Sequence, residues 1–298
     1  MRRPKVFPGI VVVVAVMAIA ACGRDPRVVL AELQVPYTAE ALVAQAAEGD
    51  VEAVTLLLDA GMPVDSRDNR GSTALIAAAV DRHLPVVEAL LDAGADLNVR
   101  NDDGVTALSA AAWNGDLDTA RALLDKGADV RVERPVATLP LMRAIRGGHD
   151  DMVALLLEKG AIAYVQDDQW SALMLAAFLG RDVAVATLIQ WGVDVNAKND
   201  RGMTALMHAA SRGHVAIINT LLAKGAHVAA VDAGGHTALM YAANNGHLEA
   251  ARAVLDAKAD AGVRNRTGAT AMSLATGNGH ADIVALLQQF LPPARPLP

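Results

Sequence analysis

Methionine and histidine recur at matching positions along this chain, and both side chains can bind metal ions. The methionines are Met142, Met174, Met207 and Met240. The histidines are His83, His149, His214, His247 and His280. Neighbours within each series are at least 32 residues apart. Side chains that repeat on stacked helices lie about 8–10 Å apart, which is too far for two of them to share one ion. We therefore favour core packing for the methionines and bonds to the turn backbone for the histidines over a copper site or another metal site.

Carboxylates gather where the chain is predicted to turn. The set is Asp65, Asp68, Asp102, Asp103, Asp167, Asp168, Asp200 and Asp232. Asp is frequent in turns because its side chain bonds nearby backbone N–H groups, and the spacing of a calcium-binding EF-hand is absent. We favour this structural role over the alternative, an acidic edge that attracts a basic partner.

Sequence motifs of enzymes are absent from the chain. There is no nucleophile elbow, phosphate-binding loop, HExxH or CxxC motif. Asp and His are plentiful, but they occupy positions that recur along the chain. We therefore predict a protein that is not an enzyme and that binds no cofactor and no metal.

Cys22 is the single cysteine, so no internal disulfide can form. It follows a basic start and an apolar run over 9–21, which is typical of a signal peptide and too short to span a membrane. The sequence Ile-Ala-Ala-Cys-Gly at 19–23 resembles a bacterial lipobox. That resemblance implies cleavage before Cys22 and attachment of acyl chains such as palmitate. The alternative is an ordinary signal peptide, or a signal anchor, with an incidental cysteine.

The lipobox resemblance also implies a location in the bacterial cell envelope, lipid-anchored and facing the periplasm. Gly23 stands where Asp favours the inner membrane, so the outer membrane is favoured. Residues 22–36 are then a lipidated tether, in which Pro26 and Pro36 discourage a long helix. Removal of residues 1–21 leaves 23 basic and 33 acidic side chains, a net charge of −10. This acidic balance argues against nucleic acid as a partner.

The longest-range pattern is a phrase of Thr-Ala-Leu followed by small residues. Its first residue falls at Thr73, Thr106, Leu139, Ser171, Thr204, Thr237 and Thr270. These positions are 33 residues apart, except for one step of 32, and such a period is typical of a solenoid. The phrase and its period resemble the ankyrin repeat. The resemblance implies an all-α solenoid of about eight helix-turn-helix units with short β-hairpin fingers, which we expect to be a monomer.

The repeat register sets the expected domain organisation. A signal peptide covers 1–21, the tether 22–36, the repeat domain 37–291 and a Pro-rich tail 292–298. The units lie near 37–67, 68–100, 101–133, 134–165, 166–198, 199–231, 232–264 and 265–291. Gln288 stands where earlier units have an aliphatic residue, as expected of a terminal cap with no neighbour.

The ankyrin resemblance implies that the fingers and the ends of the first helices line a concave protein-binding face. Candidate residues on it are Trp113, Asn114, Arg146, Trp170, Phe178, Leu179, Met203, Arg212 and Asn245. Exposed aromatic side chains in such a place are candidate anchors for a partner. Trp170 could instead fill the finger that is one residue short, and we assign Trp191 to packing on the opposite side.

Two functions remain open at this stage. The first is a membrane-tethered scaffold that binds a partner protein through the concave face. The second is an immunity or inhibitor protein that neutralises a toxin or enzyme in the periplasm, for which an acidic surface would suit a basic toxin.

Overall fold

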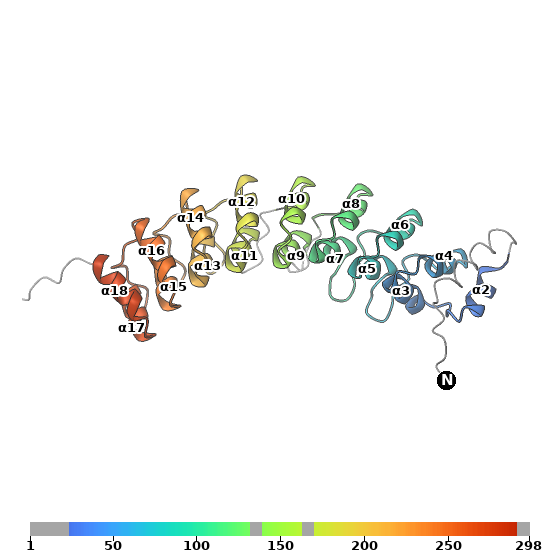
Figure 1. Cartoon of the computed structure of the whole chain (residues 1–298), viewed down its shortest axis with the longest axis horizontal. Coiled ribbons are helices and arrows are strands. Elements are labelled where there is room, and N and C mark those ends of the chain that lie inside the picture. Colours follow the sequence, from blue (N-terminus) through green and yellow to red (C-terminus); the bar gives the residue numbers. More distant parts are fainter. Residues whose placement is uncertain (1–23, 132–138, 163–169, 291–298) are drawn as a thin grey trace, which may run out of the picture. The chain divides into compact units, whose positions relative to one another are not determined.

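The computed structural model describes residues 24–131, 139–162 and 170–290, and these residues form helices α2 to α18 without a β-strand (Figure 1). The chain divides into two compact units, Met1–Met152 and Val153–Pro298, with the division inside α10 (Asp150–Glu158). The predicted signal peptide, Cys22 and the Pro-rich tail lie outside the described residues.

Each predicted repeat from residue 37 onward contains one helix pair. The first helices of the pairs are α3 (Ala39–Glu48), α5 (Ala74–Val80), α7 (Ala107–Asn114), α9 (Pro140–Gly147), α11 (Ala172–Leu179), α13 (Ala205–Arg212), α15 (Ala238–Asn244) and α17 (Ala271–Gly277). The second helices are α4 (Val51–Asp59), α6 (Leu84–Asp92), α8 (Leu117–Asp125), α10, α12 (Asp182–Gln190), α14 (Val215–Ala223), α16 (Leu248–Asp256) and α18 (Ala281–Phe290). Within each unit, first helices pack on first helices and second helices on second helices.

A threonine or serine side chain caps the N-terminus of nearly every first helix. The side chains of Thr38, Thr73, Thr106, Ser171, Thr204, Thr237 and Thr270 each accept a hydrogen bond from the backbone N–H three residues further on. Such N-caps satisfy backbone donors that the helix itself leaves unpaired. Leu139 makes no such bond, and Pro140 follows it at the first helical position, where its missing N–H costs nothing. The Thr-Ala-Leu register therefore predicted the helix starts correctly.

Small and flexible apolar side chains fill the space between successive first helices. One alanine of every repeat from the second onward is fully buried, and the set is Ala78, Ala111, Ala144, Ala176, Ala209, Ala242 and Ala275. Met142, Met174, Met207 and Met240 are also buried in this layer. Their role as adaptable core filler is confirmed.

The recurring histidines bond the backbone of the preceding repeat. In His83, His149, His214, His247 and His280, Nε2–H donates to a carbonyl oxygen 36 residues earlier at 2.9–3.1 Å. A glycine of the preceding repeat leaves room for the ring. At Gly213, for example, an added Cβ would come within 2.8 Å of the His247 ring. The predicted structural role is confirmed, and it fixes Nε2 as the protonated nitrogen of each ring.

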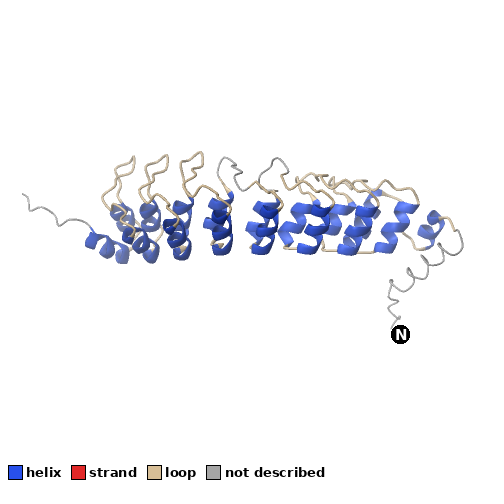
Figure 2. Cartoon of the chain, turned by 90° about the horizontal axis from the view of Figure 1, so that it is seen from above, coloured by secondary structure: helices blue, strands red, loops and turns tan. Residues whose placement is uncertain are grey.

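The fingers are tight turns held by side-chain oxygens. In five of them one Oδ1 atom accepts two backbone N–H bonds, and the residues are Asp68, Asn101, Asn199, Asp232 and Asn265. The expected hairpins shorten to such turns among the described residues, with one antiparallel bridge between Arg67 and Thr73. Figure 2 shows the finger loops of each unit extending to one side of its helices. Asp68 and Asp232 thus take the predicted turn role, while Asp167 and Asp168 lie outside the described residues.

The two ends of the array are closed differently. At the C-terminal end Gln288 is exposed, as predicted for a cap. At the N-terminal end, within the segment predicted as a tether, the short helix α2 (Pro26–Glu32) packs against α4 and buries Val29 and Leu30. Asp25 caps this helix, and Pro26 sits in its first turn, where proline favours a helix start.

The docking of α2 yields a stability prediction. Leu30 is 1% exposed, whereas Val28 on the same helix is 49% exposed. Leu30→Ala should lower the free energy of unfolding by about 2–4 kcal/mol, because it leaves a cavity against α4. Val28→Ala, the matched control, should change it by less than about 0.5 kcal/mol. Urea unfolding followed by circular dichroism measures both, and equal stability of the two variants would contradict the packing.

Candidate interaction surface

The predicted binding residues fall into both units. Trp113, Asn114 and Arg146 belong to the first unit. Trp170, Phe178, Leu179, Met203, Arg212 and Asn245 belong to the second. We use the term first-helix face for the exposed side chains on the first helices and at the bases of their fingers. It corresponds, within each unit, to the predicted concave face.

In the first unit, an exposed tryptophan lies beside an arginine of the next repeat. Trp113 is 48% exposed at the end of α7, and the Arg143 guanidinium of α9 lies 5.7 Å from its ring centroid. Such cation–π contacts favour Arg over the ring face. Burial first, and then the charge of Arg146, lowers the pKa of Arg143, while Asp103 acts in the opposite direction. Arg143 was not predicted, although it stands where the two preceding repeats have Ala77 and Ala110.

In the second unit, three rings gather at the finger side of α11 and α13. Trp170 lies 5.0 Å from Phe178 and 4.6 Å from His208, measured between ring centroids. The guanidinium of Arg212 lies 4.6 Å from the Phe178 ring centroid. The structure therefore brings together three of the predicted residues, and it adds His208, which was not predicted. Trp170 is half-buried in this cluster, so it packs against its neighbours and still presents part of its ring.

His208 is a buried titratable group without a hydrogen bond at Nε2. His208 is 5% exposed and packs beside the Trp170 and Phe178 rings. Burial lowers the pKa of His208 to about 4, because the charged imidazolium loses its hydration there. The sequence signal was that histidine replaces an apolar residue, since Leu175 and Leu274 hold the same repeat position.

The predicted asparagines serve the scaffold. Asn114 Nδ2 donates to the carbonyl oxygens of Ala79 and Val80, and Asn245 Nδ2 donates to that of Ser211. Asn114 thereby links two repeats at a step where Asp116 replaces the recurring histidine. Both amides are committed to the preceding repeat, so they contribute shape to the first-helix face and few free donors. Leu179 and Met203 are half-buried at its margin.

The exposure of Trp191 differs from the prediction that this side chain packs. It follows α12 and is 52% exposed, and Val183 on the same second helix is 56% exposed. Trp191 was expected to pack, because it stands at the end of a second helix. Gly192 takes the chain away from the helix directly after it, which leaves the indole at the surface.

A polar network in the seventh repeat resembles a proton relay but stabilises a finger. The Tyr241 hydroxyl donates to Asp232 Oδ2 at 2.7 Å, and His236 lies between Asp232 and Asn265. Burial and then this bond raise the pKa of Tyr241 well above its ordinary range. Burial also raises the pKa of Asp232, but the hydrogen bonds it accepts outweigh that effect and lower it. A tyrosine that is harder to ionise does not act as a nucleophile at neutral pH.

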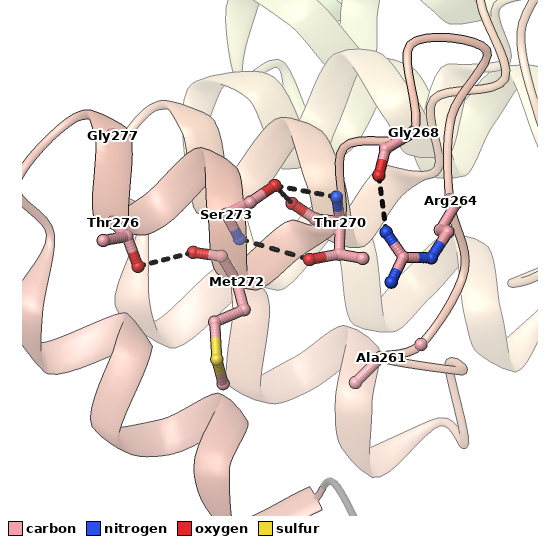
Figure 3. Close-up of a pocket in the computed structure, with 9 residues that line it drawn as sticks. Ala261, Arg264, Gly268, Thr270, Met272, Ser273, Thr276 and Gly277 are labelled. Carbon is pink, nitrogen blue, oxygen red and sulfur yellow. Dashed lines mark hydrogen bonds between the residues drawn. The ribbon is translucent and has the colours of Figure 1, made fainter.

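Elsewhere among the described residues the structure gives weaker indications of a functional site. A shallow hollow on the last repeat contains Met272 and Arg264, and the hydroxyls of Ser273 and Thr276 there bond carbonyls of their own helix start or turn (Figure 3). In the part of the chain that the structure describes, no three His, Cys, Asp or Glu side chains gather as a metal site would require. No helix within those same residues has the length and apolar character to cross a membrane.

Comparison with known proteins agrees with the helix pairs and the finger turns. A family model described as ankyrin repeats, in three copies, matches residues 41–134, 132–199 and 187–265. The chain belongs to the ankyrin-repeat family. Its fold is an all-α ankyrin-repeat solenoid, and ankyrin repeats are protein–protein interaction modules. No curated protein matches this ankyrin chain.

The buried His208 gives the ankyrin array a predicted pH dependence. The folded-state pKa of His208, about 4, lies below the ordinary value of 6.5, so the unfolded chain binds a proton that the folded chain resists. His208 protonation does not affect the free energy of unfolding above about pH 6.5. As the pH falls from there to about 4, protonation of the unfolded chain lowers that free energy by up to about 3 kcal/mol. His208→Leu should remove this loss. Urea unfolding at pH 7.5 and 5.0 compares the two proteins, and an equal loss in both would contradict the prediction.

Proposed function

We propose that this ankyrin array is a membrane-tethered scaffold that holds a partner protein on its first-helix face. The observation that carries the proposal is the solvent-exposed Trp113, set on a first helix beside Arg143. A large exposed aromatic side chain is unfavourable for an isolated protein and is enriched among the anchors of interfaces. The Trp170–Phe178–His208 cluster with Arg212 supports the same role in the second unit.

The division of labour along the repeat supports this choice of face. Positions that recur in most repeats are occupied by caps, buried alanines and histidines, which are bonded or packed within the array. The side chains that differ from repeat to repeat, such as Trp113, Phe178 and Arg212, stand on the first helices. A scaffold needs this combination, because a uniform framework carries a surface that is specific to one partner.

The tether in this proposal is a lipid on Cys22, in the cell envelope of a bacterium and facing the periplasm, with the outer membrane favoured. It is supported by the lipobox-like residues 19–23 and by the single cysteine. Acyl chains contribute about 0.8 kcal/mol per buried CH₂, so two or more chains anchor a protein stably. In this proposal the protein is a monomer without enzymatic activity, and nucleic acid is not its partner.

An immunity or inhibitor function is the second candidate, and one feature favours it. The second helices carry many carboxylates, among them Asp150 and Asp151 at the start of α10. A basic toxin or enzyme would be attracted to that side of the array. Binding there would leave Trp113 and Phe178 without a role, and this separates the two candidates.

Trp113→Ala combined with Phe178→Ala should reduce the partner recovered by affinity capture from the protein's own membranes by at least about tenfold, since interface anchors contribute 2 kcal/mol or more. Trp191→Ala, which removes an exposed tryptophan from a second helix, is the matched control and should leave recovery unchanged. Thermal unfolding checks that all variants remain folded. Mass spectrometry that finds the same proteins in the same amounts with every variant rules out this face.

Cys22→Ser tests the tether. The wild-type chain, expressed in a bacterial host that processes lipoproteins, should incorporate an alkyne-tagged fatty acid and sediment with membranes. The variant should incorporate none. A wild-type protein that is cleaved and released without label would identify an ordinary signal peptide, and the lipid anchor would then be rejected.

A further inference from the structure

The two helix rows of this acidic protein carry opposite charge. The second helices contain Asp or Glu in every case except α14, and their basic residues are Arg121 and Arg252. The first helices from α5 to α17 contain no Asp and no Glu, and their charged residues are Arg143, Arg146 and Arg212. The net charge of −7 therefore conceals a first-helix row whose formal charge is positive.

Two of the three arginines of this row lie over aromatic rings. Arg143 lies over Trp113 in the first unit, and Arg212 lies over Phe178 in the second. Neither guanidinium forms an ion pair with a carboxylate among the described residues. Nε of Arg143 is buried without a hydrogen-bond partner. Each unit thus presents a guanidinium that is positioned by an aromatic ring.

Two of the finger carboxylates are already used as acceptors within the fold. Asp68 and Asp232 are bonded to their own turns, and Asp232 also accepts from Tyr241. Arg201 stands on the finger of the sixth repeat, close enough to Tyr241 for its charge to lower the pKa of that hydroxyl. Asp103 is a finger carboxylate near enough to Arg143 for its charge to act against the lowering of the Arg143 pKa.

We propose that the segment bound by the first-helix face is acidic, with carboxylates next to aromatic or aliphatic side chains. A carboxylate fits the planar fork of a guanidinium through two parallel hydrogen bonds. An arginine already stacked on a ring is restrained before binding, so it loses less freedom when the pair forms. The apolar neighbours of the carboxylate then cover Trp113 in the first unit, or Trp170 and Phe178 in the second.

This inference rests on the proposed function, because it names the chemistry of the partner for the same face. It is the opposite of what net charge alone would suggest, since an acidic protein is expected to attract basic partners. The carboxylates that would attract a basic partner lie on the second helices, which form the other helix row. A partner segment carrying both signs would be oriented by the difference between the two rows.

The test selects peptides from a random twelve-residue display library against the full chain purified from membranes. Enriched peptides should be acidic and contain an aromatic or aliphatic residue. One of them, synthesised with a fluorophore, should bind at least about tenfold more weakly to Arg212→Glu or Arg143→Glu, because hydrogen bonds to charged groups contribute about 1.5–3 kcal/mol. Binding to wild type should also weaken as salt increases.

Two arginines of the second helices provide matched controls. Arg121→Glu for the first unit and Arg252→Glu for the second make the same charge change on the other row, and they should leave peptide affinity within about twofold. A selection that yields no acidic peptide dependent on Arg143 or Arg212 overturns the inference. Neutral or basic peptides that still require Trp113 or Phe178 overturn it while retaining the proposed face. Peptides whose binding survives Trp113→Ala with Phe178→Ala reject the face itself.

Discussion

The close approach of successive first helices is the constraint on which the rest of this array depends. One alanine per repeat, such as Ala111 or Ala209, is completely buried at that contact. A larger side chain there would push the helices apart, and the histidine of one repeat would no longer reach the carbonyl of the one before. The hydrogen bond of His214 to Phe178 and the stacking of finger turns both require this spacing. The same contact recurs once in each repeat, and the period of the sequence reflects this recurrence.

Side chains that bond the backbone of the array occupy different repeat positions from the side chains that vary between repeats. The threonine caps, the finger Asp and Asn oxygens and the histidines satisfy backbone groups that would otherwise be unpaired. Because these positions are fixed by the backbone, variation collects at other positions of the first helices. Arg143, His208 and Tyr241 occupy one such position in three repeats, and each makes a different contact.

Much of the scaffold could be predicted from sequence because its determinants are local. Thr204 caps its own helix and Asp232 closes its own turn, so three or four residues suffice to recognise each. The surface was predicted less completely, since the Trp170–His208 contact joins residues from successive repeats and depends on their packing. At the N-terminal end Pro26 and Pro36 were expected to discourage a long helix, and α2, which Pro26 opens after Asp25, is only seven residues long. The burial of its Val29 and Leu30 was not predicted, because it depends on packing against α4, a separate segment of the chain.

The docking of α2 also limits the distance between the folded array and Cys22. The folded array begins at Asp25, three residues after Cys22, and three residues of extended chain span about 10 Å. An acyl anchor on Cys22 would therefore hold Asp25, where α2 begins, within about 10 Å of the lipidated residue. Partners fixed in the same membrane would meet the array at a high effective concentration, whereas a long flexible tether would dilute that advantage.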